Sequence, residues 1–230
     1  MRTDAGQSGQ DATMQERAPA RGSRPPGSPW TVQAILIDVP LEAMGRMSAT
    51  RANTRASFVA DLMTPVLLAS VCLRYEKVQA LPAVATLLAG LLVFTLVEYV
   101  FHRWIFHGSC PVRQFEEGHA RHHVDPLGDD ALPFFLPPAI LVVLAGLFCL
   151  AMPAGYALLL AAAVGFGYAC YGTGHYIIHS VRFRHPVGRK WAARHHIHHH
   201  HPDRNFGVTT PLWDILLGTR YVSKAARKGG

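Results

Sequence analysis

The sequence predicts an all-α membrane protein in which four transmembrane helices carry a helical, histidine-rich cap on the cytoplasmic side. Three observations support this fold class. Half of the 230 residues are hydrophobic and only 16% are charged, whereas about 25% is usual for a soluble domain. The hydrophobic residues gather in four long runs. All fourteen histidines lie between positions 102 and 201.

The apolar runs define the expected domain organisation. They are Phe58–Leu73, Leu81–Phe101, Ala131–Met152 and Ala154–Gly174. The last three have the length of about 20 apolar residues that a helix needs to cross a bilayer, and the first qualifies if it is tilted. We therefore expect a membrane domain over 51–222. A disordered polar segment, 1–50, would precede it, and a basic tail, 223–230, would follow it.

The basic residues predict the orientation. Ten Lys and Arg residues follow position 180, whereas only Arg74 and Lys77 separate the first two runs. By the positive-inside rule both termini and every histidine-rich segment lie in the cytoplasm. The composition, without an organelle signal, favours a bacterial inner membrane. The basic residues form no single stripe, so no nucleic-acid partner is expected.

Four histidine clusters mark a candidate metal site. They contain His102 and His107; His119, His122 and His123; His175 and His179; and the run 195–201. Residues spaced i, i+3 and i+4 share a helix face, so the second cluster can converge on one point, as can His195, His198 and His199. His102 and His107 are five apart, about 140° apart on a straight helix. They can share a site only if that helix bends or ends, or if they flank two metals.

The composition of the clusters narrows the choice of metal. Imidazole suits iron, zinc, copper and nickel, and ten imidazoles exceed the usual shell of one tetrahedral ion. We therefore expect two ions. The four cysteines form no CxxC pair and no HExxH motif occurs, which disfavours thiolate zinc, iron–sulfur clusters and zincin proteases. Spacing does not separate iron from zinc.

Several segments together resemble the fatty acid hydroxylase/sterol desaturase superfamily, most closely its fatty acid 2-hydroxylase branch. They are EYVFHRWIFH (98–107), HARHH (119–123), FFLPP (134–138), YACYGTGHYIIH (168–179), HHIHHHH (195–201) and NFGVTTPLWDILLGT (205–219). The resemblance implies an O2-dependent oxidoreductase with a cytoplasmic di-iron centre that hydroxylates an aliphatic chain of a lipid or fatty acid. Zinc is the alternative ion.

The resemblance also implies a ligand set. It consists of His102, His107, His119, His122, His123, His175, His179, His195, His198 and His199. The last motif has an alternative register through His196, His199 and His200. No catalytic residue beyond the ligands and no further cofactor site is expected.

Two departures from the family pattern have consequences. Gly172 stands where the family commonly has Asp, so a carboxylate partner for His175 is in doubt. No cytochrome b5-like domain is expected before the membrane domain, so electrons would come from a separate protein. For Glu98 we expect Arg103 or a histidine N–H as the partner. Asn205 and Asp214 are candidate acceptors for imidazole N–H groups, or ordinary cap and turn residues.

Two alternatives remain open at this point. The same site is compatible with a carotenoid ring hydroxylase or a sterol-type desaturase, since spacing does not define the substrate. A non-catalytic membrane metal-binding protein is the second alternative. A transporter, however, would carry its ligands along a path inside the spans, whereas these histidines gather at helix ends.

Overall fold

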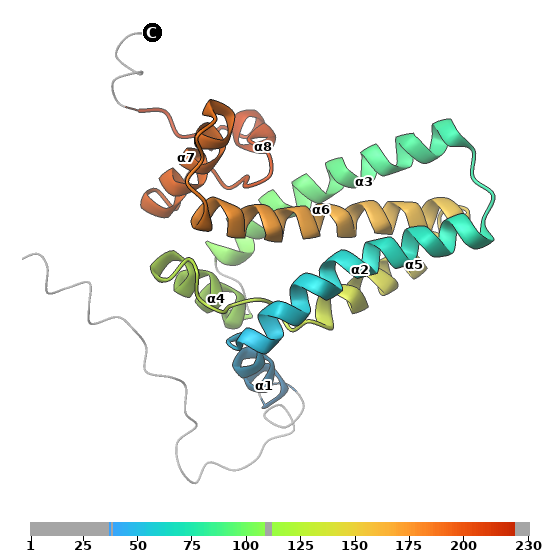
Figure 1. Ribbon diagram of the computed structural model, residues 1–230, viewed down its shortest axis with the longest axis horizontal. Coiled ribbons are helices and arrows are strands. Elements are labelled where there is room, and N and C mark those ends of the chain that lie inside the picture. Colours follow the sequence, from blue (N-terminus) through green and yellow to red (C-terminus); the bar gives the residue numbers. More distant parts are fainter. Residues whose placement is uncertain (1–36, 38, 109–111, 224–230) are drawn as a thin grey trace, which may run out of the picture. The chain divides into compact units, whose positions relative to one another are not determined.

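The computed structural model describes residues 37, 39–108 and 112–223, and no strand occurs among them. The helices, in chain order (Figure 1), are α1 (Val39–Ser48), α2 (Arg51–Tyr75), α3 (Ala80–Val100), the π-helix η2 (Phe101–Phe106), α4 (Arg113–Val124), α5 (Leu136–Cys149), α6 (Ala154–Ser180), α7 (Pro186–His200) and α8 (Leu212–Leu216). Most of the predicted polar segment, and the predicted basic tail after Ser223, lie outside the described residues.

Helix α1 differs from the sequence prediction, which treated 1–50 as disordered. Its residues satisfy helix rules at both ends: Glu42 lies in the first turn and Arg46 in the last, each at the end of the helix dipole that favours its charge. The two side chains form an i,i+4 ion pair at 3.7 Å. The short apolar pattern of this stretch was too weak to predict the helix.

Three helices are long and apolar enough to cross a membrane: Arg51–Tyr75, Ala80–Phe106 and Ala154–Ser180. The third apolar run of the sequence forms only the 14-residue helix α5. At 1.5 Å per residue α5 is about 21 Å long, which is shorter than the hydrocarbon core of about 30 Å. Of the four spans predicted, three are therefore present as full-length helices.

Polar side chains of α2 stabilise the non-helical stretch that leads into α5. The Asn53 side chain donates to the carbonyls of Ala131 and Leu132, at 3.1 and 2.9 Å, and accepts from the Phe134 N–H at 2.9 Å. The Ser57 hydroxyl also donates to the Leu132 carbonyl. Because both side chains are buried, they provide the partners that an extended backbone lacks away from water.

A second contact fixes the other end of this segment. The Cys72 thiol donates to the Gly155 carbonyl at 3.3 Å. Asn53 and Cys72 are 19 residues apart on α2, which corresponds to about 28 Å. The chain between Leu132 and Gly155 therefore covers the same length of α2, partly as helix and partly as turns and irregular backbone.

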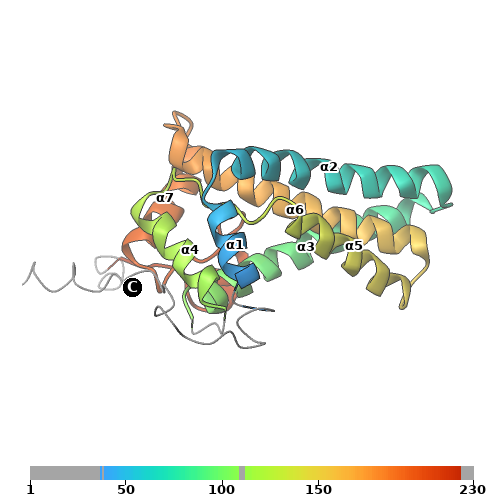
Figure 2. The same ribbon diagram turned by 90° about the horizontal axis from the view of Figure 1, so that it is seen from below.

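Helix α6 is the central helix, packed against α2, α3 and α5 (Figure 2). Small residues allow this close packing. A Cβ on Gly167 would lie 2.6 Å from the Phe94 ring, and one on Gly90 would lie 2.5 Å from Ala163. The surrounding helices turn large apolar side chains outward, and Leu67, Leu88 and Val142 are each at least 58% exposed. Exposed apolar side chains of this kind suit a lipid environment.

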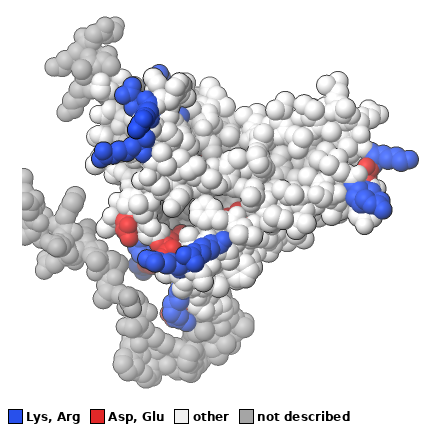
Figure 3. Space-filling view, viewed as in Figure 1, with Lys and Arg blue, Asp and Glu red and all other residues white. Residues whose placement is uncertain are grey.

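The functional segments lie at one end of the bundle. At that end the second span finishes in η2, and the third span, α6, also finishes there. Helices α4, α7 and α8 lie beyond these two helix ends (Figure 1). On the face in Figure 3, Lys and Arg side chains occupy the two ends, and the stretch between them carries neither. This distribution matches a bundle whose middle lies in hydrocarbon.

We expect the N53A variant to unfold more easily, because it leaves the Ala131 carbonyl and the Phe134 N–H without their partners, while the Leu132 carbonyl keeps only Ser57. Each buried unsatisfied group costs about 1–3 kcal/mol. The check is the thermal midpoint of the detergent-solubilised protein. S70A is the matched control, since Ser70 bonds only to the Val66 carbonyl of its own helix. Equal midpoints for N53A and S70A would contradict this assignment.

Candidate metal centre

The second span ends in the π-helix η2, and this geometry allows His102 and His107 to share a site although they are five residues apart. In η2 the hydrogen bonds run from i to i+5, so residues five apart lie about one turn apart. His102 and His107 therefore lie on the same side, with their rings stacked 5.3 Å apart at 28°. Of the two routes that the sequence left open, a change in helix geometry is the one observed.

The first histidine group contains His102, His107, His119, His123 and His198. His119 lies at its centre. The Nε2 atom of His119 is 3.1 Å from that of His102, 2.9 Å from that of His107 and 3.0 Å from that of His123. The Nε2 atoms of His107 and His198 are 3.0 Å apart. Five rings from three elements thus point the same ring atom at one space.

The second histidine group contains His122, His175, His179, His195 and His199. Here His195 is central, with its Nε2 atom 2.8 Å from that of His175 and 3.0 Å from those of His179 and His199. The Nε2 atom of His122 is buried without a hydrogen-bond partner. A polar atom left in this way calls for a partner that is not part of the chain.

Each group draws on both H-x2-H-H motifs, which corrects the expectation that each motif converges on one point. In α4, His119 and His123 belong to the first group and His122 to the second. In α7 the roles are reversed, since His195 and His199 lie in the second group and His198 in the first. The reason is geometric: positions i+3 and i+4 lie on opposite sides of position i, about 100° apart, so adjacent histidines diverge.

The two groups adjoin each other. The rings of His123 and His199, one from each group, stack with centroids 4.4 Å apart. His119 and His122, also one from each group, lie 5.8 Å apart. Two ions held by these groups would therefore be neighbours.

The remaining histidines lie outside both groups. His196 and His200, the alternative register of the last motif, are exposed. His185 caps α7 by accepting from the Val187 N–H. His201 stacks on Tyr221, with ring centroids 4.6 Å apart. The ten histidines that the resemblance implied are thus the ten that the structure brings together.

Backbone carbonyls set the tautomer of two rings of the first group, His102 and His198. The Nδ1–H of His102 donates to the Phe206 carbonyl, and that of His198 donates to the Arg204 carbonyl at 2.8 Å. Because a carbonyl accepts only, each neutral ring carries its proton on Nδ1. Their Nε2 atoms therefore present lone pairs to the first group. Such outer hydrogen bonds are typical of metal-ligating histidines.

The donor set and its geometry fit metal ions. With metal–nitrogen distances of about 2.0–2.1 Å, ligands at right angles lie about 2.9 Å apart. The Nε2 pairs are 2.8–3.1 Å apart, and the five donor atoms of each group lie within 4.8 Å of one another. Where neither Nε2 atom of such a pair carries a proton, the two lone pairs repel one another unless a cation lies between them.

Burial keeps these rings in the neutral form that binds metal. It lowers the pKa of His107 to about 4 and the pKa values of His122, His198 and His199 to about 3, with neighbouring histidines adding to the effect. A ligand must be deprotonated to coordinate. At neutral pH the groups are therefore ready to bind an ion.

The loop after α7 was noted in the sequence, but its role comes from contacts across the fold. Glu98 accepts from the N–H groups of Val208 and Thr209 and from the Thr209 hydroxyl. The expectation of Arg103 or a histidine as its partner was wrong, since Arg103 donates to the Tyr99 hydroxyl at 2.8 Å. Glu98 thus holds a loop rather than an imidazole.

Asp214 holds the same loop from its other side. It accepts from the N–H groups of Phe206 and Gly207, at 2.9 and 2.8 Å, and from the Thr219 hydroxyl at 2.7 Å. Asn205 begins the loop with a positive φ of 56°, a conformation that Asn tolerates. Neither the Asp214 side chain nor the Asn205 side chain forms a hydrogen bond with a histidine. Their influence on His102 therefore passes through the Phe206 carbonyl.

The Gly172 departure also has a structural counterpart. A Cβ at Gly172 would meet nothing within 4 Å, so no side chain replaces the missing carboxylate there. His175 instead stacks on Tyr171, with ring centroids 5.5 Å apart. The Nδ1 atom of His195 is buried without a hydrogen-bond partner. The second group is thus less supported by hydrogen bonds than the first.

Comparison with known proteins agrees with this geometry. The family described as "Fatty acid hydroxylase" matches residues 87–219, a range that contains all ten grouped histidines. This chain belongs to the fatty acid hydroxylase family. The matched range also includes Glu98, Asp214 and the loop that they hold.

Curated relatives carry related names. Dihydroceramide fatty acyl 2-hydroxylase FAH1 of Arabidopsis thaliana is 31% identical over 60% of this chain and 62% of its own length. FAH2 of the same plant is 30% identical over 74% of this chain and 75% of its own length. The alignment with FAH1 therefore spans less than two thirds of that relative.

A solved structure shares the fold. It is described as full-length Scs7p with only the hydroxylase domain visible, and it matches with a TM-score of 0.64 and 27% identity. The match covers 77% of this chain and 69% of that one. The helical arrangement described above is therefore that of a fatty acid hydroxylase family domain.

We expect H122A and H198A each to lower the metal content of the anaerobically purified protein by about one ion per chain, since each removes a converging nitrogen from one group. H196A and H200A are the matched controls, because they change exposed histidines of the same run. Elemental analysis measures the result. Full metal content in H122A and H198A, or its loss in the controls, would refute the ligand set.

We expect the metal-free protein to lose stability as the pH falls below 6.5. The unfolded chain takes up protons on its histidines there, while the folded groups stay neutral until about pH 3–4. The unfolded state then binds more protons, so the free energy of unfolding decreases with falling pH. Thermal midpoints between pH 7.5 and 5 measure this. A midpoint that is constant or rises on acidification would contradict it.

Proposed function

We propose that this chain is a membrane di-iron oxygenase that hydroxylates C2 of a fatty acyl chain. The observation that carries the proposal is the pair of adjoining five-histidine groups at the end of an apolar bundle. The relatives named above are acyl 2-hydroxylases, which favours an acyl substrate over a carotenoid or a sterol. No observation favours a non-catalytic metal carrier, since the histidines cluster at one end of the spans.

Iron is the metal that we propose, because zinc, the other ion considered from the sequence, does not change oxidation state. The groups have enough nitrogen donors for two ions, and hydroxylation with O2 requires metals that change oxidation state. The ions would supply the activation of O2 and the abstraction of hydrogen from an unactivated C–H bond. The chain's own residues would hold, orient and shield the reacting centre.

The chain's contribution to the chemistry is positional. The Phe206 and Arg204 carbonyls keep protons on the Nδ1 atoms of His102 and His198, so these rings stay oriented through the cycle. Phe106 stacks on His119, with centroids 4.9 Å apart, and Phe206 lies 5.8 Å from His102. These apolar rings exclude water from the first group, which protects a strong oxidant from side reactions.

The reaction requires a partner to balance. One oxygen atom enters the C–H bond and the other leaves as water, with two electrons and two protons consumed. We propose that a separate donor protein supplies the two electrons. The substrate, a fatty acid or an acyl lipid, would enter from the bilayer.

We propose the following placement in the membrane. Residues 51–222 form the catalytic unit, in which α2, α3 with η2, the segment 131–153 and α6 are the four crossings. The cap of α4, α7 and α8 faces the cytoplasm of a bacterial cell, because Lys and Arg are abundant beyond α6 and at the start of α2. The contacts of Asn53 and Cys72 support the third crossing despite its short helix.

Expression in a host without 2-hydroxylated lipids tests this function. We expect 2-hydroxy acyl chains in total lipid hydrolysates with the wild-type chain and with H196A, and at least a hundredfold less with H122A or H179A. Growth under ¹⁸O2 would place one labelled oxygen in each new hydroxyl. Equal product in H122A, or altered carotenoids with unchanged acyl chains, would overturn the proposal.

A further inference from the structure

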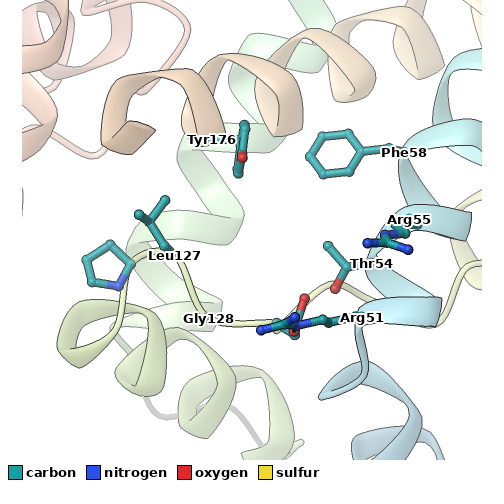
Figure 4. A pocket seen from close by; sticks show the side chains of 9 residues that line it. Arg51, Thr54, Arg55, Phe58, Leu127, Gly128 and Tyr176 are labelled. Atoms are coloured by element: carbon teal, nitrogen blue, oxygen red, sulfur yellow. The ribbon is translucent and has the colours of Figure 1, made fainter. Parts of the chain in front are cut away.

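An open cleft is lined in part by Tyr176, which directly follows His175 of the second histidine group. It has a volume of about 670 Å³ and is formed by the start of α2, the end of α6 and the loop after α4 (Figure 4). Its lining residues are Arg51, Thr54, Arg55, Phe58, Pro126, Leu127, Gly128, Asp129 and Tyr176. None of them belongs to the histidine groups, and only Tyr176 lies within one of the sequence motifs, 168–179.

The cleft carries a net positive charge. Arg51 and Asp129 form an ion pair at 3.5 Å. Arg55 makes no ion pair and no hydrogen bond with any residue that the structure describes, although its side chain lines the same space. One positive charge therefore remains uncompensated at the wall.

Apart from Thr54, the rest of the wall is largely apolar. Phe58 and Tyr176 meet edge to face, with ring centroids 5.9 Å apart, and Leu127 lies across the cleft from the helices (Figure 4). A cationic group above aromatic and aliphatic surface is the pattern expected for a ligand with an anionic head and an apolar tail.

The cleft is also next to the reacting centre. Tyr176 directly follows His175 on α6 and precedes His179 by less than one turn, and Pro126 comes three residues after His123. In a C2 hydroxylation the carboxyl carbon is bonded to the carbon that reacts, so the head group must be held close to the metals. A cleft walled by the neighbours of three grouped histidines meets this requirement.

We propose that this cleft is the head-group site, in which Arg55 binds the anionic head of an acyl substrate. The inference rests on the proposed function and specifies its substrate class: acyl chains with a negative charge next to the reacting carbon, of which a free fatty acid is the simplest. A guanidinium holds a carboxylate or a phosphate through paired hydrogen bonds. A ceramide offers a neutral amide and leaves Arg55 without a partner.

Binding to the full chain in lipid nanodiscs tests this without turnover. The probes are palmitate, hexadecyl phosphate, palmitamide and C16 ceramide, measured with the metal-loaded wild type, R55Q, R55K and R74Q. R74Q is the matched control, because Arg74 is an exposed arginine at the other end of α2. Metal content and thermal midpoint are measured for each variant, and R55K provides a second test should R55Q fold poorly.

We expect R55Q to weaken palmitate binding about tenfold or more, R55K to restore part of it and R74Q to leave it unchanged. Palmitamide and ceramide should bind weakly and respond little to R55Q. A preference for palmitate over hexadecyl phosphate would assign a free fatty acid, and the reverse would assign a phosphorylated lipid. Equal palmitate affinity in R55Q and wild type, or equal binding of palmitate and palmitamide, would overturn the proposal.

The outcome is separable from that of the proposed function. Arg55-dependent binding without any 2-hydroxylated product would refute the reaction and keep the head-group site. A 2-hydroxylated product whose yield and palmitate affinity do not depend on Arg55 would keep the reaction and refute the site.

Discussion

The mutual approach of imidazole nitrogens is the constraint on which the rest of this structure depends. Seven pairs of Nε2 atoms lie 2.8–3.1 Å apart. The central Nε2 atoms of His119 and His195 each approach three others, and because a ring nitrogen can share a proton with only one of them, repulsion remains among the rest. Burial keeps the rings uncharged, so they cannot relieve this repulsion by taking up protons. Cations between the nitrogens would turn the repulsion into coordination, and metal binding would then contribute directly to the stability of the fold.

Holding ten rings in this arrangement requires support from segments distant in sequence. Glu98 on α3 and Asp214 on α8 together accept hydrogen bonds from four consecutive backbone N–H groups, those of residues 206–209. The loop so fixed presents the Phe206 carbonyl to His102. Two buried carboxylates thereby act on the site without touching a grouped histidine, which explains why acidic residues occur at these otherwise apolar positions.

In the membrane bundle, too, side chains provide hydrogen-bond partners for backbone groups outside the helices. A 14-residue α5 is too short to match its neighbours, and the missing length is irregular backbone whose polar groups bond to Asn53 and Ser57. The cleft beside this region lies where α2, α6 and the loop after α4 converge. Support of the bundle and the wall of this cleft therefore depend on the same end of α2.

The sequence alone determined the helical class and the apolar runs, because hydrophobic length is a local property, whereas the set of ten histidines came from the resemblance to a family. It did not determine how the histidines are divided between the two groups. His122 and His123 point in directions about 100° apart on α4, and this difference assigns them to different groups only once other helices surround them. The π-turn at His102, the loop acceptors of Glu98 and the short α5 were likewise decided by tertiary structure. Each depends on partners about 80 or more residues away or on a backbone hydrogen-bond shift, and neither leaves a periodic signal in the chain.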